Sequence, residues 1–476
     1  MRLFVIEWAN GLPEMVDVIK EIKEKGHEII YWSGSDLDKI NGQYFSETIF
    51  HDHSDAIAGR PARGIDDSDF LPPGRELTIQ LAETESTILT MMNKKYPALT
   101  VDERKHLYYH MVRYWTGVLT SMRPDVVIFL CTPHTVYNYV VYSLAKLFGI
   151  KTIMFDVALV GDYRIIGLND YIKGNSYLEK LVSEGQNYSL SDLSEVTKSY
   201  YANQINPDID AIPAYTKDYV ASRSGFALLS LRLKVLLKSI INLSIFKKLL
   251  IFLATEIGAN MKKEYVALQT KPDWQRPYIY LPLNYQPEAT TSPMGGIYVD
   301  QILMVETLAA SIPSDWLIYV KEHPGQWLTS SKRYFNYRYR GYYKEIMVSP
   351  NVRLVPIDTN NYDLINHSRA VATVTGTPGW EALLRAKPAI VFGFPWYQHC
   401  PGVMKVNDVV SCRKAVEKIK SGLEVHSQGI INFLYNLEKV SWLGFNDIGT
   451  KKASRASENE TRNAYVKFLL SQIESV

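Results

Sequence analysis

The run VATVTGTPGWEALLRAKPAIVF, residues 371–392, places a strand, a tight turn, a helix and a second strand in quick succession. The pattern predicts a strand at Val371–Val374, a helix at Pro378–Ala386 and a strand at Ala389–Phe392. Thr377 is a favourable N-cap, and Pro378 suits the first position of a helix. Strand–helix–strand units at this spacing are typical of a parallel, doubly wound sheet.

The same alternation occurs upstream, in two separate parts of the chain. Nearby, it predicts strands at Tyr278–Leu283, Trp316–Lys321 and Val352–Ile357 and helices at Tyr298–Ser311 and Asn361–His367. In the amino-terminal part, it predicts strands at Leu3–Trp8, Glu28–Trp32, 126–131 and Lys151–Phe155 and helices at Glu14–Lys25 and Val136–Phe148. We therefore expect an α/β fold with two Rossmann-like lobes and a cleft between them. The predicted division is 1–215, 216–270, 271–445 and 446–476, for the first lobe, a connector, the second lobe and a final helix.

Composition excludes several classes of protein. The chain has 476 residues with 52 Lys and Arg against 50 Asp and Glu, a net charge of +2, so no overall field attracts nucleic acid. Cys131, Cys400 and Cys412 are widely spaced and form no CxxC pair, which supports neither a disulfide framework nor a cysteine zinc site. The amino-terminal residues lack the long apolar region of a signal peptide. We expect a cytoplasmic protein.

One segment stands out from this balanced composition. Residues 225–254 are apolar and basic, and their uncharged runs are too short to span a membrane. This connector could lie on an anionic membrane surface, at the inner face of the cytoplasmic membrane. Alternatively, its helices pack between the lobes.

The turn after Val374 has the features of an anion site. A helix that starts at the carboxyl end of a parallel strand directs backbone N–H groups and its dipole at an anion. The glycines would let a phosphate approach the backbone, the threonines would add hydroxyl donors, and a carboxylate one turn later could hold the sugar hydroxyls of a nucleotide. The residues expected at this site are Thr375, Gly376, Thr377, Gly379 and Glu381. The alternative is an ordinary helix cap with a solvated glutamate.

Two further motifs follow strands of the same predicted sheet. Glu322-His323-Pro324 follows one strand; His323 could donate to a phosphate or a leaving-group oxygen, most strongly as an imidazolium, and Glu322 could orient it or touch the sugar. The loop after the first strand is rich in hydroxyl, amide and carboxylate groups. Its candidates for donor binding are Tyr285, Gln286, Glu288, Thr290 and Ser292. Both motifs could equally be simple turns, but the carboxyl ends of parallel strands share one rim.

Together, the runs LPLNYQPEATTSPMGG, YVKEHPGQ and TVTGTPGWEALLRAKPAIVFGFPWY resemble the capsule polysaccharide biosynthesis family, which includes transferases of Kdo (3-deoxy-manno-octulosonic acid). The resemblance covers about residues 277–408 and implies the two-lobe glycosyltransferase architecture called GT-B. It also implies a nucleotide-activated sugar, possibly CMP-linked, with its phosphate near Thr375–Gly379 and His323 and its ribose near Glu381. No metal or other cofactor is implied. The acceptor, a polysaccharide or lipid-linked glycan, would lie against the first lobe.

The resemblance implies that a catalytic carboxylate comes from the first lobe. Glu7, which ends the first strand, is one candidate. The loop IDDSDFLPPGRE is preferred, since its three acids beside two prolines and flanking arginines look constrained; these acids are Asp66, Asp67 and Asp69. His134 and Asp156 are candidates on the acceptor side of the cleft.

Three functions fit these motifs. The leading hypothesis is a glycosyltransferase of surface polysaccharide or glycolipid assembly. A polyol-phosphate transferase or a sugar-nucleotide 2-epimerase would use a related two-lobe fold. A non-catalytic polysaccharide-binding or export protein is the third, because a fold does not fix a function.

Overall fold

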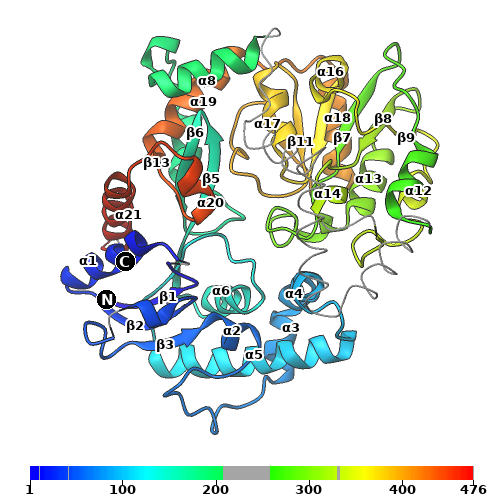
Figure 1. Ribbon diagram of the computed structural model, residues 1–476. Helices are drawn as coiled ribbons and strands as arrows, with labels where there is room; N and C mark the ends of the chain where they lie inside the picture. Colours follow the sequence, from blue (N-terminus) through cyan, green and yellow to red (C-terminus); the bar gives the residue numbers. More distant parts are fainter. Residues whose placement is uncertain (10, 41, 207–257, 330–332, 475–476) are drawn as a thin grey trace, which may run out of the picture.

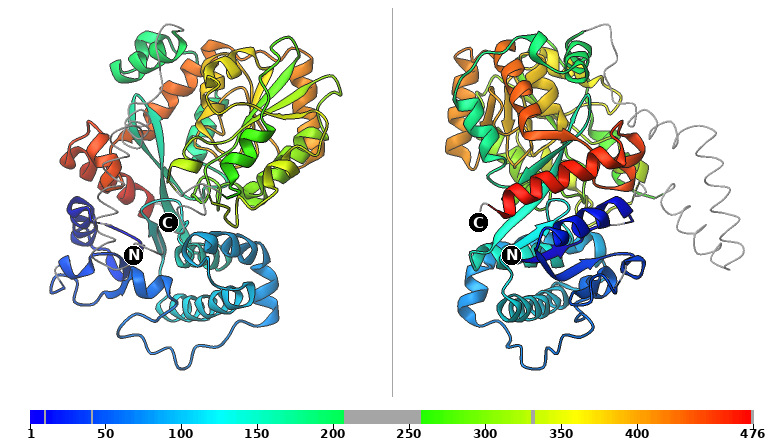
Figure 2. Two further views of the ribbon diagram at one scale, coloured as in Figure 1. Left: turned by 45° about the vertical axis from the view of Figure 1, so that its right-hand side comes forward. Right: turned by 90° about the vertical axis from the view of Figure 1, so that its left-hand side faces the viewer.

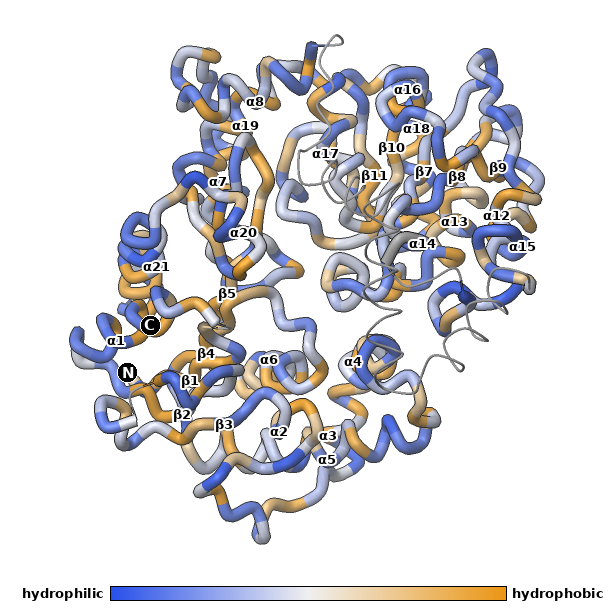
Figure 3. Tube along the Cα trace, in the orientation of Figure 1, coloured by the Kyte–Doolittle hydropathy of each residue, from blue (hydrophilic) through white to orange (hydrophobic). Residues whose placement is uncertain are grey.

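The computed structural model of the chain describes residues 1–9, 11–40, 42–206, 258–329 and 333–474 (Figure 1). These residues form two lobes, each built on a sheet with helices against it, so the predicted α/β fold with two Rossmann-like lobes is confirmed. Apolar residues concentrate along the strands of both sheets, and polar residues along the outer helices (Figure 3). The basic segment 225–254 lies outside the described residues.

The sheet of the amino-terminal lobe has seven strands in the order β13-β6-β5-β4-β1-β2-β3. Their bounds are β1 (Arg2–Ile6), β2 (Glu28–Gly34), β3 (Ile49–Asp52), β4 (Val126–Phe129), β5 (Lys151–Val160), β6 (Asp162–Leu168) and β13 (Ser441–Leu443). Strands β1 to β5 are parallel, whereas β6 is antiparallel to β5 and β13 is antiparallel to β6. The chain order reverses between β1 and β4, and such a reversal leaves a crevice at the carboxyl ends of the two strands.

The two helices predicted for this lobe are present, and residues 75–122 form further helices between them. The longest of these begins at a capping box made by Thr100 and Glu103. The bounds are α1 (Pro13–Glu24), α2 (His53–Ile57), α3 (Arg75–Gln80), α4 (Ala82–Lys95), α5 (Val101–Met122), α6 (Tyr137–Leu147), α7 (Ser176–Ser183) and α8 (Glu195–Ile205). Helix α4 faces the second lobe (Figure 1).

The sheet of the carboxyl-terminal lobe has six parallel strands in the order β12-β11-β10-β7-β8-β9. The strands are β7 (Tyr278–Pro282), β8 (Leu317–Lys321), β9 (Val352–Leu354), β10 (Ala370–Thr373), β11 (Ala389–Val391) and β12 (Val403–Lys405). The helices are α12 (Met261–Leu268), α13 (Gln301–Ala309), α14 (Gln326–Thr329), α15 (Tyr342–Ile346), α16 (Asn361–His367), α17 (Thr377–Leu384) and α18 (Val409–Lys420). The order reverses between β7 and β10, so the crevice of this sheet lies where the loop after β7 meets the turn after β10.

The end of the chain returns to the amino-terminal lobe. It forms α19 (Ser427–Val440), β13, α20 (Ile448–Ala453) and α21 (Glu458–Ile473). Strand β13 pairs with β6, and α21 packs along α1 (Figure 2). The fully buried Tyr465 of α21 contacts the rings of Trp8 and Phe155. The predicted division at residue 445 therefore separates segments that lie together in one lobe.

Candidate functional site

A recess lies between the two lobes, as the predicted cleft requires. It encloses about 400 Å³ of empty volume, part of it open to solvent. The amino-terminal lobe lines it with Thr90, Met91, Asn93, Lys94 and His134, and the carboxyl-terminal lobe with residues of the loop after β7, with Val299 and with Tyr337. The side-chain amide of Asn336 donates to Asn93 across the lobes, at 3.1 Å. Hydroxyl, amide and charged groups make this recess suited to a polar ligand.

The turn after β10 leaves a helix N-terminus open. Helix α17 begins one residue earlier than predicted, so Gly376 is its N-cap and Thr377 is its first residue; the assignment of Thr377 as N-cap is wrong. Within the described residues, no side chain caps this end. Thr377 is exposed. The first N–H groups of a helix need partners, and an anion supplies them well.

Thr375 and Gly379 make internal contacts that stabilise this turn. The hydroxyl of Thr375 donates to the carbonyl of Thr290 at 2.6 Å, which ties the turn to the loop after β7. Gly379 is buried, and a Cβ there would collide with the hydroxyl of Tyr397, which itself donates to the carbonyl of Gly376. The expected roles of Thr375 as a free donor and of Gly379 as an open approach for phosphate are therefore corrected.

Replacing Gly379 by alanine is expected to displace the Tyr397 hydroxyl and to remove its hydrogen bond to the N-cap carbonyl of α17. Overpacking of this kind costs about 1–3 kcal/mol of the free energy of unfolding. Denaturant titration of the variant would measure it. Gly74 caps α3 at φ −77°, with open space where a Cβ would stand, so Gly74→Ala is the matched control. Equal stability of the two variants would contradict the packing role.

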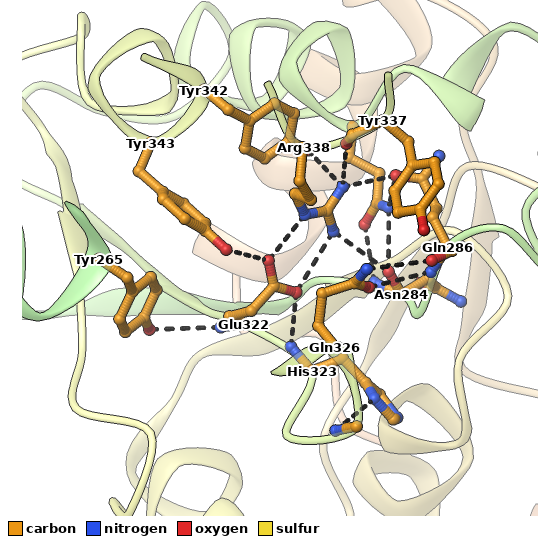
Figure 4. Close-up of polar contacts among 12 residues, drawn as sticks. Tyr265, Asn284, Gln286, Glu322, His323, Gln326, Tyr337, Arg338, Tyr342 and Tyr343 are labelled. Carbon is orange, nitrogen blue, oxygen red and sulfur yellow. Dashed lines mark hydrogen bonds and ion pairs between the residues drawn. The ribbon is translucent and has the colours of Figure 1, made fainter. Parts of the chain in front are cut away.

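Glu322 is a buried support rather than a ligand contact. Its carboxylate is 1% exposed and pairs with Arg338, which is fully buried, through Nε–Oε2 at 2.7 Å and Nη2–Oε1 at 3.2 Å (Figure 4). The hydroxyl of Tyr343 and the backbone N–H of His323 also donate to it, each at 2.7 Å. With its acceptor sites filled by these groups, Glu322 does not reach a sugar, and that alternative is corrected.

Arg338 also fixes the loop after β7, because it donates to the side-chain amide oxygen of Gln286 and to the carbonyl of Asn284 (Figure 4). Gln286 is 5% exposed and exchanges further hydrogen bonds with Gln301 and Gln326. The side chain of Gln286 therefore orders the loop. The sequence contains no motif around Arg338, so only the folded structure identifies its role.

The remaining loop candidates differ in their surroundings. Glu288 is exposed and accepts from the Thr290 hydroxyl at 3.0 Å. The buried hydroxyl oxygen of Ser292 has no partner in the described part of the chain, and Ser292 lines the recess. Tyr285 is half-buried, and its ring contacts that of His323, with centroids 5.6 Å apart. Glu288 and Ser292 both line the recess, where they can contact a ligand.

His323 follows β8 and turns its imidazole away from the buried carboxylate of Glu322 (Figure 4). Its Nδ1 accepts the backbone N–H of Gly325 at 3.1 Å, so the proton of the neutral ring is on Nε2. The imidazole is solvent-exposed, yet the protein mass around it desolvates it and lowers its pKa. The lowered pKa favours the neutral ring, which donates from Nε2, over the imidazolium that would donate most strongly. Pro324 is exposed in the turn that follows.

Glu381 lies one turn into α17, as predicted. It is half-buried, and burial raises its pKa to about 6 against the opposing charge of Arg385. Its carboxylate has no hydrogen-bond partner among the described residues. The guanidinium of Arg385 stacks on Tyr362 at 3.9 Å and donates to the backbone carbonyl of Glu381. Glu381 is thus free to accept hydroxyl groups of a ligand.

Glu7 directly follows β1, at the switch point of the other sheet. It has a left-handed backbone (φ 53°), which is uncommon outside glycine and concentrates at functional sites. Its carboxylate is 9% exposed, accepts from Thr135 Oγ1 at 2.6 Å and from the amide of Asn138, and lies 3.5 Å from Nδ1 of His53. Burial raises the pKa of Glu7 to about 7, although those hydrogen bonds oppose the shift. His53 carries no sequence signal and was not predicted.

The three acids of the preferred catalytic loop lie elsewhere. Asp66 and Asp69 are exposed, and Asp67 pairs with Arg113 of α5 at 3.2 Å. This loop runs along the side of the amino-terminal lobe that faces away from the other lobe (Figures 1 and 2). The preference for Asp66, Asp67 and Asp69 as catalytic groups is therefore corrected: the ion pair with α5 gives the loop its constraint.

His134 and Asp156 both lie at the inner side of the amino-terminal lobe. His134 lines the recess between the lobes. Asp156 lines a second, smaller recess with Tyr171 of this lobe and Phe394 and Trp396 of the other. Burial raises the pKa of Asp156 to about 6. Burial thus raises the pKa of two carboxylates of this lobe, Glu7 behind the His134 turn and Asp156 in the second recess.

No group of three or more His, Cys, Asp or Glu residues in the described ranges has the arrangement of a metal site. No helix in these ranges is long and apolar enough to cross a bilayer.

Comparisons with known proteins point to the carboxyl-terminal lobe. Residues 289–426 match the model of the family described as capsule polysaccharide biosynthesis protein. The capsule polysaccharide modification protein LipA of Neisseria meningitidis is 36% identical over 80 residues, which are 17% of this chain and 10% of that protein. The match thus spans only a small part of this relative's length.

Two solved structures are similar to this chain at low sequence identity and low TM-score. The β-Kdo 2,7 transferase KpsC of Thermosulfurimonas dismutans is 10% identical, with a TM-score of 0.30 and coverage of 79% of this chain and 95% of that one. UDP-GlcNAc 2-epimerase of Methanocaldococcus jannaschii is 13% identical, with a TM-score of 0.26 and coverage of 92% and 98%. The family match over residues 289–426 agrees with the resemblance that the motifs of the carboxyl-terminal lobe show.

Proposed function

We propose that the protein is a glycosyltransferase of GT-B type that moves a sugar from a nucleotide-activated donor to a bacterial surface polysaccharide or glycolipid. The observation that carries the proposal is the uncapped N-terminus of α17 at the switch point of the parallel sheet. Backbone N–H groups there would neutralise the leaving phosphate, and His323 would donate to it from Nε2. The family match supports a role in capsule synthesis.

Each lobe would bind one of the two substrates. The carboxyl-terminal lobe would hold the donor, possibly a CMP-linked sugar such as Kdo, with Glu381 on the ribose. The acceptor would enter the recess from the side of the amino-terminal lobe. The reaction would need no metal, so chelation with EDTA should leave the rate unchanged.

The enzyme would work in the cytoplasm, with residues 225–254 at the anionic inner face of the membrane. Sedimentation of the protein with anionic vesicles at low salt, and its release from them at high salt, would support this location.

The direct test is incubation with a panel of nucleotide sugars and an acceptor extract. Release of a nucleotide only when both donor and acceptor are present supports transfer. Interconversion of a free nucleotide sugar without an acceptor would instead identify a 2-epimerase. Glycan binding without nucleotide binding would identify a non-catalytic protein.

Glu381→Gln is expected to weaken nucleotide binding about 5- to 30-fold, because a charged hydrogen bond to a ribose hydroxyl is worth about 1–2 kcal/mol. Titration calorimetry with the nucleotide would measure the change. Glu417→Gln, on α18 of the same lobe and exposed, is the control and should bind as the wild type does. Equal affinity of both variants would remove Glu381 from the donor site.

A further inference from the structure

The turn that carries His134 joins β4 to α6 and is fixed from behind by Glu7. The carboxylate of Glu7 accepts from the Thr135 hydroxyl and from the amide of Asn138, and the Asn138 oxygen accepts the backbone N–H of Thr135 at 2.8 Å. Val136 has φ 26°, an outlier for a β-branched residue. Strain held in place by a buried carboxylate indicates that this turn is built for one conformation.

The hydrogen bonds of His134 define its protonation. Nδ1 lies 2.8 Å from the carbonyl oxygen of Thr132, which can only accept, so Nδ1 carries the proton. In the neutral ring, Nε2 then has a free lone pair. Nε2 has no hydrogen-bond partner among the described residues. His323 has the opposite arrangement, because its Nδ1 accepts and its Nε2 donates.

The charges around His134 favour the neutral ring. Burial lowers its pKa, and the positive charge of Lys94 on α4 lowers it further, against the hydrogen bond to Thr132. Other ionisable groups near this part of the recess are Glu7 behind the turn with His53 beside it, Cys131 within the turn, and Glu288 and Tyr337 on the opposite lobe. A neutral imidazole with an open nitrogen beside a polar recess is suited to accept a proton.

We infer that His134 accepts the proton of the acceptor hydroxyl in the step that forms the new glycosidic bond, and that Glu7 is the positioning residue for its turn. This inference rests on the proposed glycosyl transfer. The acceptor oxygen bonds to the anomeric carbon, and the bond from that carbon to the phosphate oxygen breaks, its electron pair leaving with the phosphate. The hydroxyl proton moves to Nε2 of His134. His323, on the rim of the other sheet, stabilises the departing phosphate through its N–H.

The inference is tested with His134→Ala in the full-length protein, under the conditions in which the wild type transfers a sugar. We expect transfer to fall about 10²- to 10⁴-fold, the usual contribution of a general base. Nucleotide affinity should stay within about twofold, because His134 lies in the acceptor half. Added imidazole should restore part of the rate. His106→Ala, an exposed histidine on α5, is the control and should keep full activity.

The dependence of the transfer rate on pH distinguishes the role of His134 as proton acceptor from the positioning role of Glu7. The wild-type rate should fall as pH drops and His134 becomes protonated, and this acid limb should vanish in His134→Ala. Glu7→Gln should have a lower transfer rate, but its pH profile should still show the acid limb. Loss of the limb in Glu7→Gln, with an intact limb in His134→Ala, would overturn the inference, and so would a normal rate in His134→Ala. If the wild type itself neither binds nor releases a nucleotide, it is the proposed function that fails.

Discussion

Arg338→Met is expected to lower the free energy of unfolding of the carboxyl-terminal lobe by about 3–5 kcal/mol. Removing one partner of a buried ion pair leaves the other charge unpaired, and that is among the largest single-residue effects in proteins. In this variant, the unpaired charge would be the carboxylate of Glu322, which is 1% exposed. The loop after β7 would also lose its hydrogen bonds from the guanidinium. Chemical denaturation followed by tryptophan fluorescence would measure the loss.

Two variants make this prediction specific. Arg340→Met removes an exposed arginine two residues away and should leave stability within about 0.5 kcal/mol. Glu322→Gln combined with Arg338→Met removes both charges and should recover part of the loss, because a buried pair is often replaceable by neutral groups. If Arg338→Met is as stable as Arg340→Met, the ion pair does not hold the site together.

Glu7→Gln is expected to change how stability depends on pH. Burial in the folded protein raises the pKa of Glu7 to about 7, whereas the unfolded chain releases the proton near the ordinary pKa of 4.5. This proton therefore contributes stability that is fully present below about pH 4.5 and is lost as pH rises to about 7. The free energy of unfolding of the wild type relative to Glu7→Gln should fall by about 3 kcal/mol across this range.

Measurement at several pH values between 4 and 8 checks this slope. Glu76→Gln on the surface of α3 supplies the baseline for other titrating groups. A constant difference between the wild type and Glu7→Gln over the whole range would show that the carboxylate is ionised in the fold throughout. In that case, its hydrogen bonds to Thr135 and Asn138 outweigh its burial.

The sheets of both lobes were predictable because buried parallel strands appear as short apolar runs between helical segments. The run at 126–131 and the strand–turn–helix around Gly376 are both found where the pattern placed them. The N-cap was misassigned by one residue, since threonine and glycine both satisfy that position and only the backbone angles distinguish them.

The site was only partly predictable. Glu322 and His323 are neighbours in a short motif, but their environments are opposite, and sequence does not report that a distant Arg338 pairs with one of them. The acids at 66–69 illustrate the reverse error: charge density in a loop suggested chemistry, while the partner of Asp67 is a helix on the outer side. Pairing between distant segments is a property of the folded chain, so it escapes local patterns.

The return of β13 and α21 to the first lobe has a consequence for how the protein is made. A ribosome has already synthesised the whole second lobe before it produces the strand that pairs with β6 and the helix that covers α1. The nascent first lobe must wait with an open sheet edge and an uncovered apolar face, features that invite aggregation. Chaperone dependence during translation, and relief from it when residues 441–473 are supplied early by circular permutation, would follow from this order of synthesis.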